Sequence, residues 1–165
     1  MIQNGSVKNV LLIEDNPDDV FLMRRVFKKA QITLPLQVVT DGKQAISYLD
    51  GAGDYHYRHL YPLPDLIFLD LKLPFLHGFV VLAWIRKQVR LNEVRVVILT
   101  SSMEDQDREK AAAFGAPYIV KPPTPAMLLE AIRSLGLSLE PDVNSETAPS
   151  GTEFSKNSAS PLKLN

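Results

Sequence analysis

The chain has 165 residues, of which 45% are hydrophobic, and a formal net charge of -1. It is long enough for one domain with its own core, and its charge gives no reason to expect nucleic acid or an acidic membrane surface as a partner. It contains no cysteine, which excludes disulfide bonds and thiolate metal sites. No signal segment and no run of about 18 apolar residues is visible, so the sequence predicts a cytoplasmic protein.

Short apolar runs alternate with helical patterns along most of the chain. The runs, typical of strands buried on both faces of a parallel sheet, are Val10–Ile13, Leu36–Thr40, Leu66–Leu69, Val96–Leu99 and Tyr118–Val120. Apolar spacing and polar start signals predict helices from Pro17 to Ala30 and over Gly42–Leu49, Gly78–Gln88, Met103–Phe114 and Thr124–Leu135, with Ser101 or Ser102 capping the fourth. Residues 51–64 are rich in Gly, Pro and Tyr and predict a loop.

This alternation predicts an α/β fold of the (βα)5 type. Right-handed crossovers give a doubly wound, five-stranded parallel sheet, and we expect the strand order 2-1-3-4-5. The composition divides the chain into a flexible N-terminus (1–8), one domain (9–136) and a tail (137–165). The tail is rich in Ser, Pro, Asn, Thr and Glu, so it cannot bury enough apolar surface to offset its ordering entropy, and we expect it to be disordered.

Polar residues follow four of the predicted strands. Glu14 and Asp15 follow the first, and Asp70, Thr100 and Lys121 follow the third, fourth and fifth. Ligands of open parallel sheets bind outside the carboxyl ends of the strands, so these side chains should share one pocket. Such a set can hold a divalent cation and accept a phosphoryl group. Taken singly, each acid could be a helix cap and the lysine a surface residue, but capping does not explain three converging acids.

Four motifs in this order resemble the receiver domain of response regulators in two-component signalling. They are IEDNP at 13–17, LDLKLP at 69–74 followed by Gly78, ILTSS at 98–102 and YIVKP at 118–122. The similarity covers about residues 8–136. It implies the flavodoxin-like fold of chemotaxis-type receivers, with Asp70 as the phosphoacceptor.

The resemblance also implies roles for the other pocket residues. Mg²⁺ would be held directly by Asp15 and Asp70, through water by Glu14, and by the backbone carbonyl of Lys72. Lys121 would pair with Asp70 and then with a phosphoryl oxygen, and receivers hold the bond that follows this lysine, here to Pro122, in the cis form.

Two further residues would form a switch. Thr100 would donate a hydrogen bond to the phosphoryl group, and Tyr118 would be the aromatic residue that follows the Thr100 loop inward on phosphorylation. A capping threonine and a half-buried strand tyrosine are equally consistent with these two residues when each is taken alone.

The long 51–64 loop and the short sequence after the last helix are similar to the single-domain regulators that pair with bacterial phytochrome histidine kinases. The resemblance implies such a kinase as partner, with the first helix, including Phe21, Arg24 and Arg25, on the kinase side. It also implies a homodimer through the fourth helix, fifth strand and fifth helix, a face in which we expect Ala111–Ala113 and Phe114. No direct nucleic-acid contact is expected.

Two rival functions use the same residues differently. A receiver-like adaptor that binds partners without phosphorylation would not need the acids, Thr100 and Lys121 together. An aspartate-nucleophile phosphatase of the haloacid-dehalogenase type would carry a second Asp two residues after Asp70, where this chain has Lys72. We therefore expect a signalling protein, which catalyses only its own phosphorylation and dephosphorylation, rather than an enzyme with a separate substrate. The three histidines are predicted to be exposed and form no site.

Overall fold

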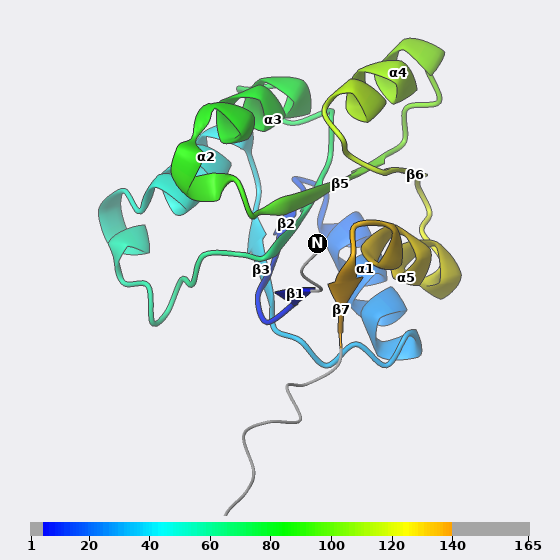
Figure 1. Cartoon of the computed structure of the whole chain (residues 1–165), viewed down its shortest axis with the longest axis horizontal. Helices are drawn as coiled ribbons and strands as arrows, with labels where there is room; N and C mark the ends of the chain where they lie inside the picture. Colours follow the sequence, from blue (N-terminus) through cyan, green and yellow to red (C-terminus); the bar gives the residue numbers. More distant parts are fainter. Residues whose placement is uncertain (1–4, 140–165) are drawn as a thin grey trace, which may run out of the picture.

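The computed structural model describes residues 5–139, so the expectations for 1–4 and 140–165 lie outside the described residues. A five-stranded parallel sheet lies between helices, with the order β3-β2-β4-β5-β6 (Figure 1). Its strands are β2 (Val10–Ile13), β3 (Leu36–Val39), β4 (Leu66–Leu69), β5 (Arg95–Thr100) and β6 (Tyr118–Val120). The helices are α1 (Pro17–Lys29), α2 (Gly42–Asp50), α3 (Gly78–Lys87), α4 (Asp105–Ala113) and α5 (Pro125–Ser134), with 3-10 turns η1 (Gly53–His56) and η2 (Val89–Leu91). The predicted (βα)5 fold and its strand order are confirmed.

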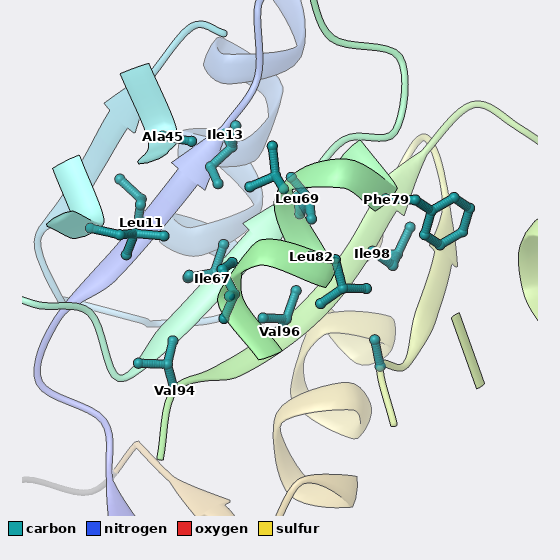
Figure 2. Close-up of a cluster of buried hydrophobic side chains, with 14 of the residues drawn as sticks. Leu11, Ile13, Ala45, Ile67, Leu69, Phe79, Leu82, Val94, Val96 and Ile98 are labelled. Carbon is teal, nitrogen blue, oxygen red and sulfur yellow. The ribbon is translucent and has the colours of Figure 1, made fainter. Parts of the chain in front are cut away.

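The central strands β2, β4 and β5 are almost fully buried on both faces, and their alternating side chains belong to two separate cores. On one face, Leu11 and Ile67 pack with Ala45 of α2 and Leu82 of α3 (Figure 2). On the other face the second cluster joins strand residues to α1 and α5; it includes Leu12, Phe68, Met23, Phe27, Leu128 and Ile132. Because both faces are covered, the strand sequences are continuous apolar runs rather than alternating ones. Within residues 5–139, no helix has the length and apolar character needed to cross a membrane.

Four helices begin at side-chain caps, and His77 Nδ1 caps α3 by accepting from the Phe79 N–H at 3.2 Å. Asn16 accepts from the backbone N–H of Asp18 at the start of α1, and Asp41 and Thr124 do the same for α2 and α5. The predicted start of the fourth helix is wrong: α4 begins at Asp105, two residues later than expected, and no side chain caps it. Ser102 is instead buried, and its hydroxyl donates to Asp107 Oδ2 at 2.6 Å.

The predicted domain ends are wrong by a few residues at each end of the described chain. β1 (Gly5–Ser6) pairs in parallel with β7 (Leu137–Ser138), although we expected flexibility through residue 8 and disorder from residue 137. The physical reason is burial: Val7 is 2% exposed and belongs to the second core cluster, against which Leu137 packs. Val7 N–H also donates to the Ser138 carbonyl at 2.9 Å, which ties the two segments together.

The predicted 51–64 loop folds back onto α2 around one arginine. Arg58 donates to the carbonyls of Tyr48 and Leu49 at 2.7 and 3.0 Å and to that of Tyr61 at 3.2 Å. The first two belong to the last turn of α2, where the Tyr48 carbonyl also accepts from the Gly51 N–H and the Leu49 carbonyl from Arg90. Tyr48 packs against Tyr61, and its hydroxyl donates to Pro62; burial raises the pKa of Tyr48 to about 12. The loop is therefore an ordered cap on α2.

Replacing Arg58 by alanine should lower the free energy of unfolding by about 2 kcal/mol, because three carbonyls lose a charged donor. Urea denaturation of Arg58→Ala measures this loss. Arg24→Ala is the control, because the Arg24 side chain is exposed and makes no hydrogen bond or ion pair within residues 5–139. Equal effects of the two substitutions would contradict the capping role.

Candidate functional site

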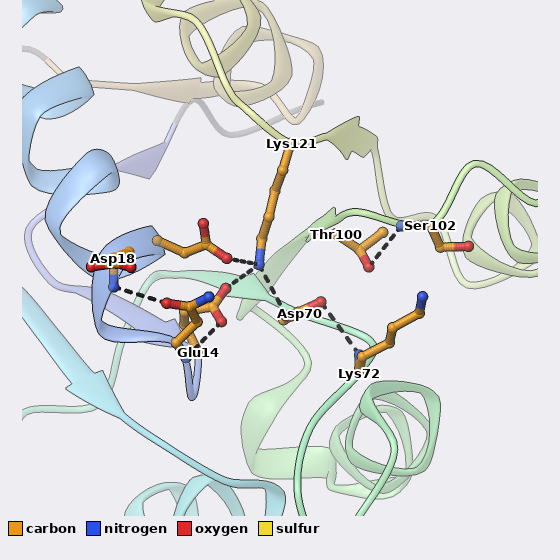
Figure 3. A network of polar contacts seen from close by, with 9 residues as sticks. Glu14, Asp18, Asp70, Lys72, Thr100, Ser102 and Lys121 are labelled. Atoms are coloured by element: carbon orange, nitrogen blue, oxygen red, sulfur yellow. Dashed lines mark hydrogen bonds and ion pairs between the residues drawn. The ribbon is translucent and has the colours of Figure 1, made fainter.

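The carboxyl ends of β2, β4, β5 and β6 meet at one edge of the sheet. The register pairs Ile13 with Leu69, so the residues that follow them, Glu14 and Asp70, leave adjacent strands side by side. Glu14 and Asp70 are 1% and 5% exposed. Figure 3 shows both acids at this edge, with Lys121 entering from the end of β6. The predicted convergence of the site residues at one edge is observed.

Lys121 connects three carboxylates from three elements. Its ammonium donates to Glu14 Oε2, to Asp19 Oδ2 at 2.9 Å and to Asp70 Oδ2 at 3.0 Å (Figure 3). An ammonium has three N–H donors, so its hydrogen-bonding capacity is filled. The Lys121–Pro122 peptide bond is cis, as the resemblance implied.

Burial and these hydrogen bonds shift the pKa values of Lys121 and Glu14. Burial alone would lower the pKa of Lys121, but the hydrogen bonds that it donates to Glu14, Asp19 and Asp70 together raise this pKa above its ordinary value. Burial raises the pKa of Glu14, against the hydrogen bonds from Lys121 and from the backbone of Asn16, which lower it. Lys121 is therefore a permanent cation that compensates buried acids.

Three of the acids can also serve a metal ion. Carboxylate oxygens of Glu14, Asp15 and Asp70 all lie within 4.8 Å of one another. Asp15 is exposed, so the cluster is open to solvent on that side. A set of hard carboxylate oxygens that is open to solvent fits a divalent metal ion.

Two glycines allow the loop after Asp70 to pack closely against neighbouring segments. A Cβ added at Gly78 would lie 2.3 Å from the Asp70 carbonyl oxygen, and one added at Gly42 would lie 2.6 Å from Leu76 Cβ. Only glycine allows these two close approaches, through which the loop after Asp70 packs against the first residues of α2 and α3. The loop in turn brings the Lys72 N–H to 3.3 Å from Asp70 Oδ1. The orientation of the Asp70 carboxylate thus depends on backbone packing as well as on Lys121.

Thr100 and Tyr118 are linked through Ser102. Thr100 is fully buried, and its hydroxyl oxygen accepts from the Ser102 N–H at 3.3 Å (Figure 3). The Tyr118 hydroxyl donates to the Ser102 carbonyl at 2.9 Å, and the Arg108 guanidinium lies over its ring at 4.9 Å. A movement of the 100–102 segment would therefore act directly on the Tyr118 ring.

Asp19 is a site residue that sequence reasoning missed, since an acid in the first turn of a helix is favourable there without any further role. Its spacing of five residues from Glu14, across a strand end and a capped helix start, is the one signal that could have pointed to it. Of the residues expected in the face of the fourth helix, Ala112 and Ala113 are exposed, whereas Ala111 is fully buried. Phe114 is half-buried against the core and stacks on Phe79 at 6.4 Å. His56, His59 and His77 are exposed as predicted.

Residues 10–133 match the family model of the response regulator receiver domain. The chain belongs to this family. Response regulator Rcp1 of Synechocystis sp. is 38% identical over 105 residues, which are 64% of this chain and 69% of Rcp1. The structure of bacteriophytochrome response regulator RtBRR has a TM-score of 0.73 at 36% identity, and the match covers 87% of this chain and 85% of RtBRR.

The relatives also include a metal-bound and a phosphorylated receiver. The Mn²⁺-bound form of Rcp1 has a TM-score of 0.63 at 32% identity, over 78% of this chain and 89% of Rcp1. The phosphorylated cyanobacterial phytochrome response regulator RcpA has a TM-score of 0.65 at 30% identity, over 78% of this chain and 90% of RcpA. This chain is thus homologous to response regulators of phytochromes, and its acidic cluster fits a divalent metal.

Removing the ammonium should destabilise the fold, because it leaves the buried acids without a counter-charge. We expect Lys121→Met to lower the free energy of unfolding by about 2–3 kcal/mol, measured by urea denaturation. Adding Glu14→Gln should restore part of the loss, since the neutral amide removes one uncompensated charge. The control is Lys72→Met, an exposed lysine at the same edge. A double variant no more stable than Lys121→Met would contradict this charge balance.

Proposed function

We propose that the protein is a response regulator switched by phosphorylation of Asp70, with a histidine kinase as the phosphoryl donor. One observation supports this most strongly: the Asp70 carboxylate lies between the Lys121 ammonium at 3.0 Å and the acids that could hold Mg²⁺. An adaptor that works without phosphorylation would have no use for this combination.

In the proposed transfer a carboxylate oxygen of Asp70 attacks the phosphorus of a phosphohistidine. A P–O bond forms in line as the P–N bond breaks, and the electron pair of that bond stays on the imidazole nitrogen. Hydrolysis by water later releases phosphate and restores the carboxylate. The protein turns over no other substrate, so it is a signalling protein rather than an enzyme in the usual sense.

Each pocket residue has a defined task in this proposal. Asp15 and Asp70 would ligate Mg²⁺ directly, with the Lys72 carbonyl and, through water, Glu14; the bound ion would neutralise charge on the phosphoryl oxygens. Lys121 would exchange its contact with Asp70 Oδ2 for one with a phosphoryl oxygen. Thr100 would donate a hydrogen bond from its hydroxyl group to another phosphoryl oxygen.

The switch follows from the links around Ser102. If the Thr100 hydroxyl donates to a phosphoryl oxygen, its oxygen can still accept from the Ser102 N–H, and the 100–102 segment would move with Thr100 toward Asp70. The Tyr118 hydroxyl, which donates to the Ser102 carbonyl, then loses or changes its partner. The ring and the Arg108 side chain over it would change position on the outer face of β6.

The homologues support a phytochrome histidine kinase as partner, because Rcp1, RcpA and RtBRR resemble this chain over most of its length and two of these names specify phytochromes. In the proposed complex the kinase approaches the exposed side of α1. Phe21 is 60% exposed there, and the Arg25 guanidinium lies over its ring at 5.9 Å.

The proposed phosphorylation predicts a mass increase of one phosphoryl group after incubation with acetyl phosphate and Mg²⁺, measured on the intact protein. The adduct should disappear with EDTA and in Asp70→Asn, which removes the nucleophile but keeps the side-chain size. An adduct that persists in Asp70→Asn would place the phosphoacceptor elsewhere. No adduct, even with a histidine kinase as donor, would favour the phosphorylation-independent adaptor.

The proposed homodimer uses the face formed by α4, β6 and α5. A groove of about 410 Å³ lies there, lined in part by Arg108, Tyr118, Met127 and Glu130. Tyr118 connects this groove to the phosphorylation site through Ser102, so the groove would report the state of Asp70. The homodimer is therefore best tested by a substitution in this groove rather than at the half-buried Phe114.

Changing Met127, which is 43% exposed in this groove, should weaken the dimer. We expect Met127→Glu to be more monomeric than wild type in sedimentation velocity, because a carboxylate in the apolar part of an interface loses its hydration. Val89→Glu is the control, since Val89 is 82% exposed on η2 and lies outside the groove. An unchanged oligomeric state in Met127→Glu would contradict this interface.

A further inference from the structure

We propose that Asp19 is a positioning residue that draws the Lys121 ammonium toward α1 and so keeps the oxygens of Asp70 and Glu14 available to a divalent cation. The inference rests on the proposed phosphoacceptor function of the same pocket. It assigns a task to an acid that lies outside the metal cluster.

Asp19 differs from the other two partners of Lys121 in place and in exposure. It reaches the ammonium from the first turn of α1, whereas Glu14 and Asp70 follow strand ends. Its side chain is 29% exposed, compared with 2% for Glu14 and 7% for Asp70. It is also absent from the carboxylates that gather within 4.8 Å of one another, which are Glu14, Asp15 and Asp70. Its contact is therefore with the lysine and not with the metal position.

Lys121 and a cation bound by the Glu14, Asp15 and Asp70 cluster compete for the same carboxylate oxygens. Asp70 Oδ2 and Glu14 Oε2 accept from Lys121, while Asp70 Oδ1 and Glu14 Oε1 accept from the backbone N–H groups of Lys72 and Asn16. Every oxygen of the two buried carboxylates is thus engaged. A cation must displace or weaken the lysine contacts, because the backbone donors are fixed by the chain.

Asp19 eases that displacement in two ways. As a third carboxylate at 2.9 Å, it offers the ammonium a partner that the cation does not need. Its charge also adds to the negative potential that attracts the cation. Without Asp19 the ammonium would be shared between Glu14 and Asp70 alone, and the pocket would carry one negative charge fewer. Both changes disfavour the cation.

The neighbouring acid provides a matched control. Asp18 lies in the same helical turn and is exposed, and no ion pair of its carboxylate is found within residues 5–139. Asp18→Asn changes the net charge as Asp19→Asn does but leaves the Lys121 contact intact. The comparison therefore separates the specific contact from the general loss of charge.

Isothermal titration of the full chain with Mg²⁺ tests the proposal. We expect the dissociation constant to rise about fivefold in Asp19→Asn and less than about twofold in Asp18→Asn. In a Lys121→Ala background the effect of Asp19→Asn should fall well below fivefold, because only the direct loss of its charge remains once the lysine contact is gone. Circular dichroism and thermal melting establish that each variant is folded.

The alternative outcomes are distinct. Equal dissociation constants for Asp19→Asn and Asp18→Asn, or an Asp19→Asn effect that is undiminished without Lys121, would overturn the positioning role and leave the phosphoacceptor function standing. A wild-type protein that binds no Mg²⁺ would overturn the positioning role and the metal-dependent function together.

Discussion

The register between β2 and β4 is the constraint on which the rest of the site depends. Because Ile13 lies opposite Leu69, the chain leaves both strands at the same edge, and the buried carboxylates of Glu14 and Asp70 follow at once. Because β2 and β4 run parallel and are paired along their full length, the residues that follow them must emerge next to each other. One ammonium, that of Lys121, then lies between acids that would otherwise repel one another.

The site gains its geometry from parts of the molecule that carry no charge. Two cores, one on each face, fix the central strands, and their ends therefore have little freedom. Gly42 and Gly78 allow the loop after Asp70 to pack where a side chain would collide. Thr100 and Tyr118 are joined to the same edge through the Ser102 backbone. A movement of the 100–102 segment would therefore reach Tyr118 through these two hydrogen bonds.

Sequence reasoning succeeded where burial leaves a pattern. A strand covered on both faces needs a continuous apolar run, so Val10–Ile13 and Leu66–Leu69 were visible, and the polar residues after them marked the ligand edge. It failed where tertiary contacts decide. The two-residue strands β1 and β7 carry no pattern, and their pairing depends on the burial of Val7. From the sequence alone Asp19 is no more than a favourable helix-start residue, because its contact with Lys121 joins positions 102 apart.

The carboxylates at this edge of the sheet exceed the charge of Lys121, and we propose that this excess creates a binding place for a divalent cation. The free energy of unfolding, measured by urea denaturation at increasing Mg²⁺ concentration, tests it most directly. A cation that binds the folded state stabilises it in proportion to the logarithm of its concentration above the dissociation constant. We predict this increase for the wild type and its loss in Asp15→Asn, which removes the exposed acid of the cluster without touching the Lys121 contacts. A wild-type stability that does not respond to Mg²⁺, or an equal response in Asp15→Asn, would contradict the account.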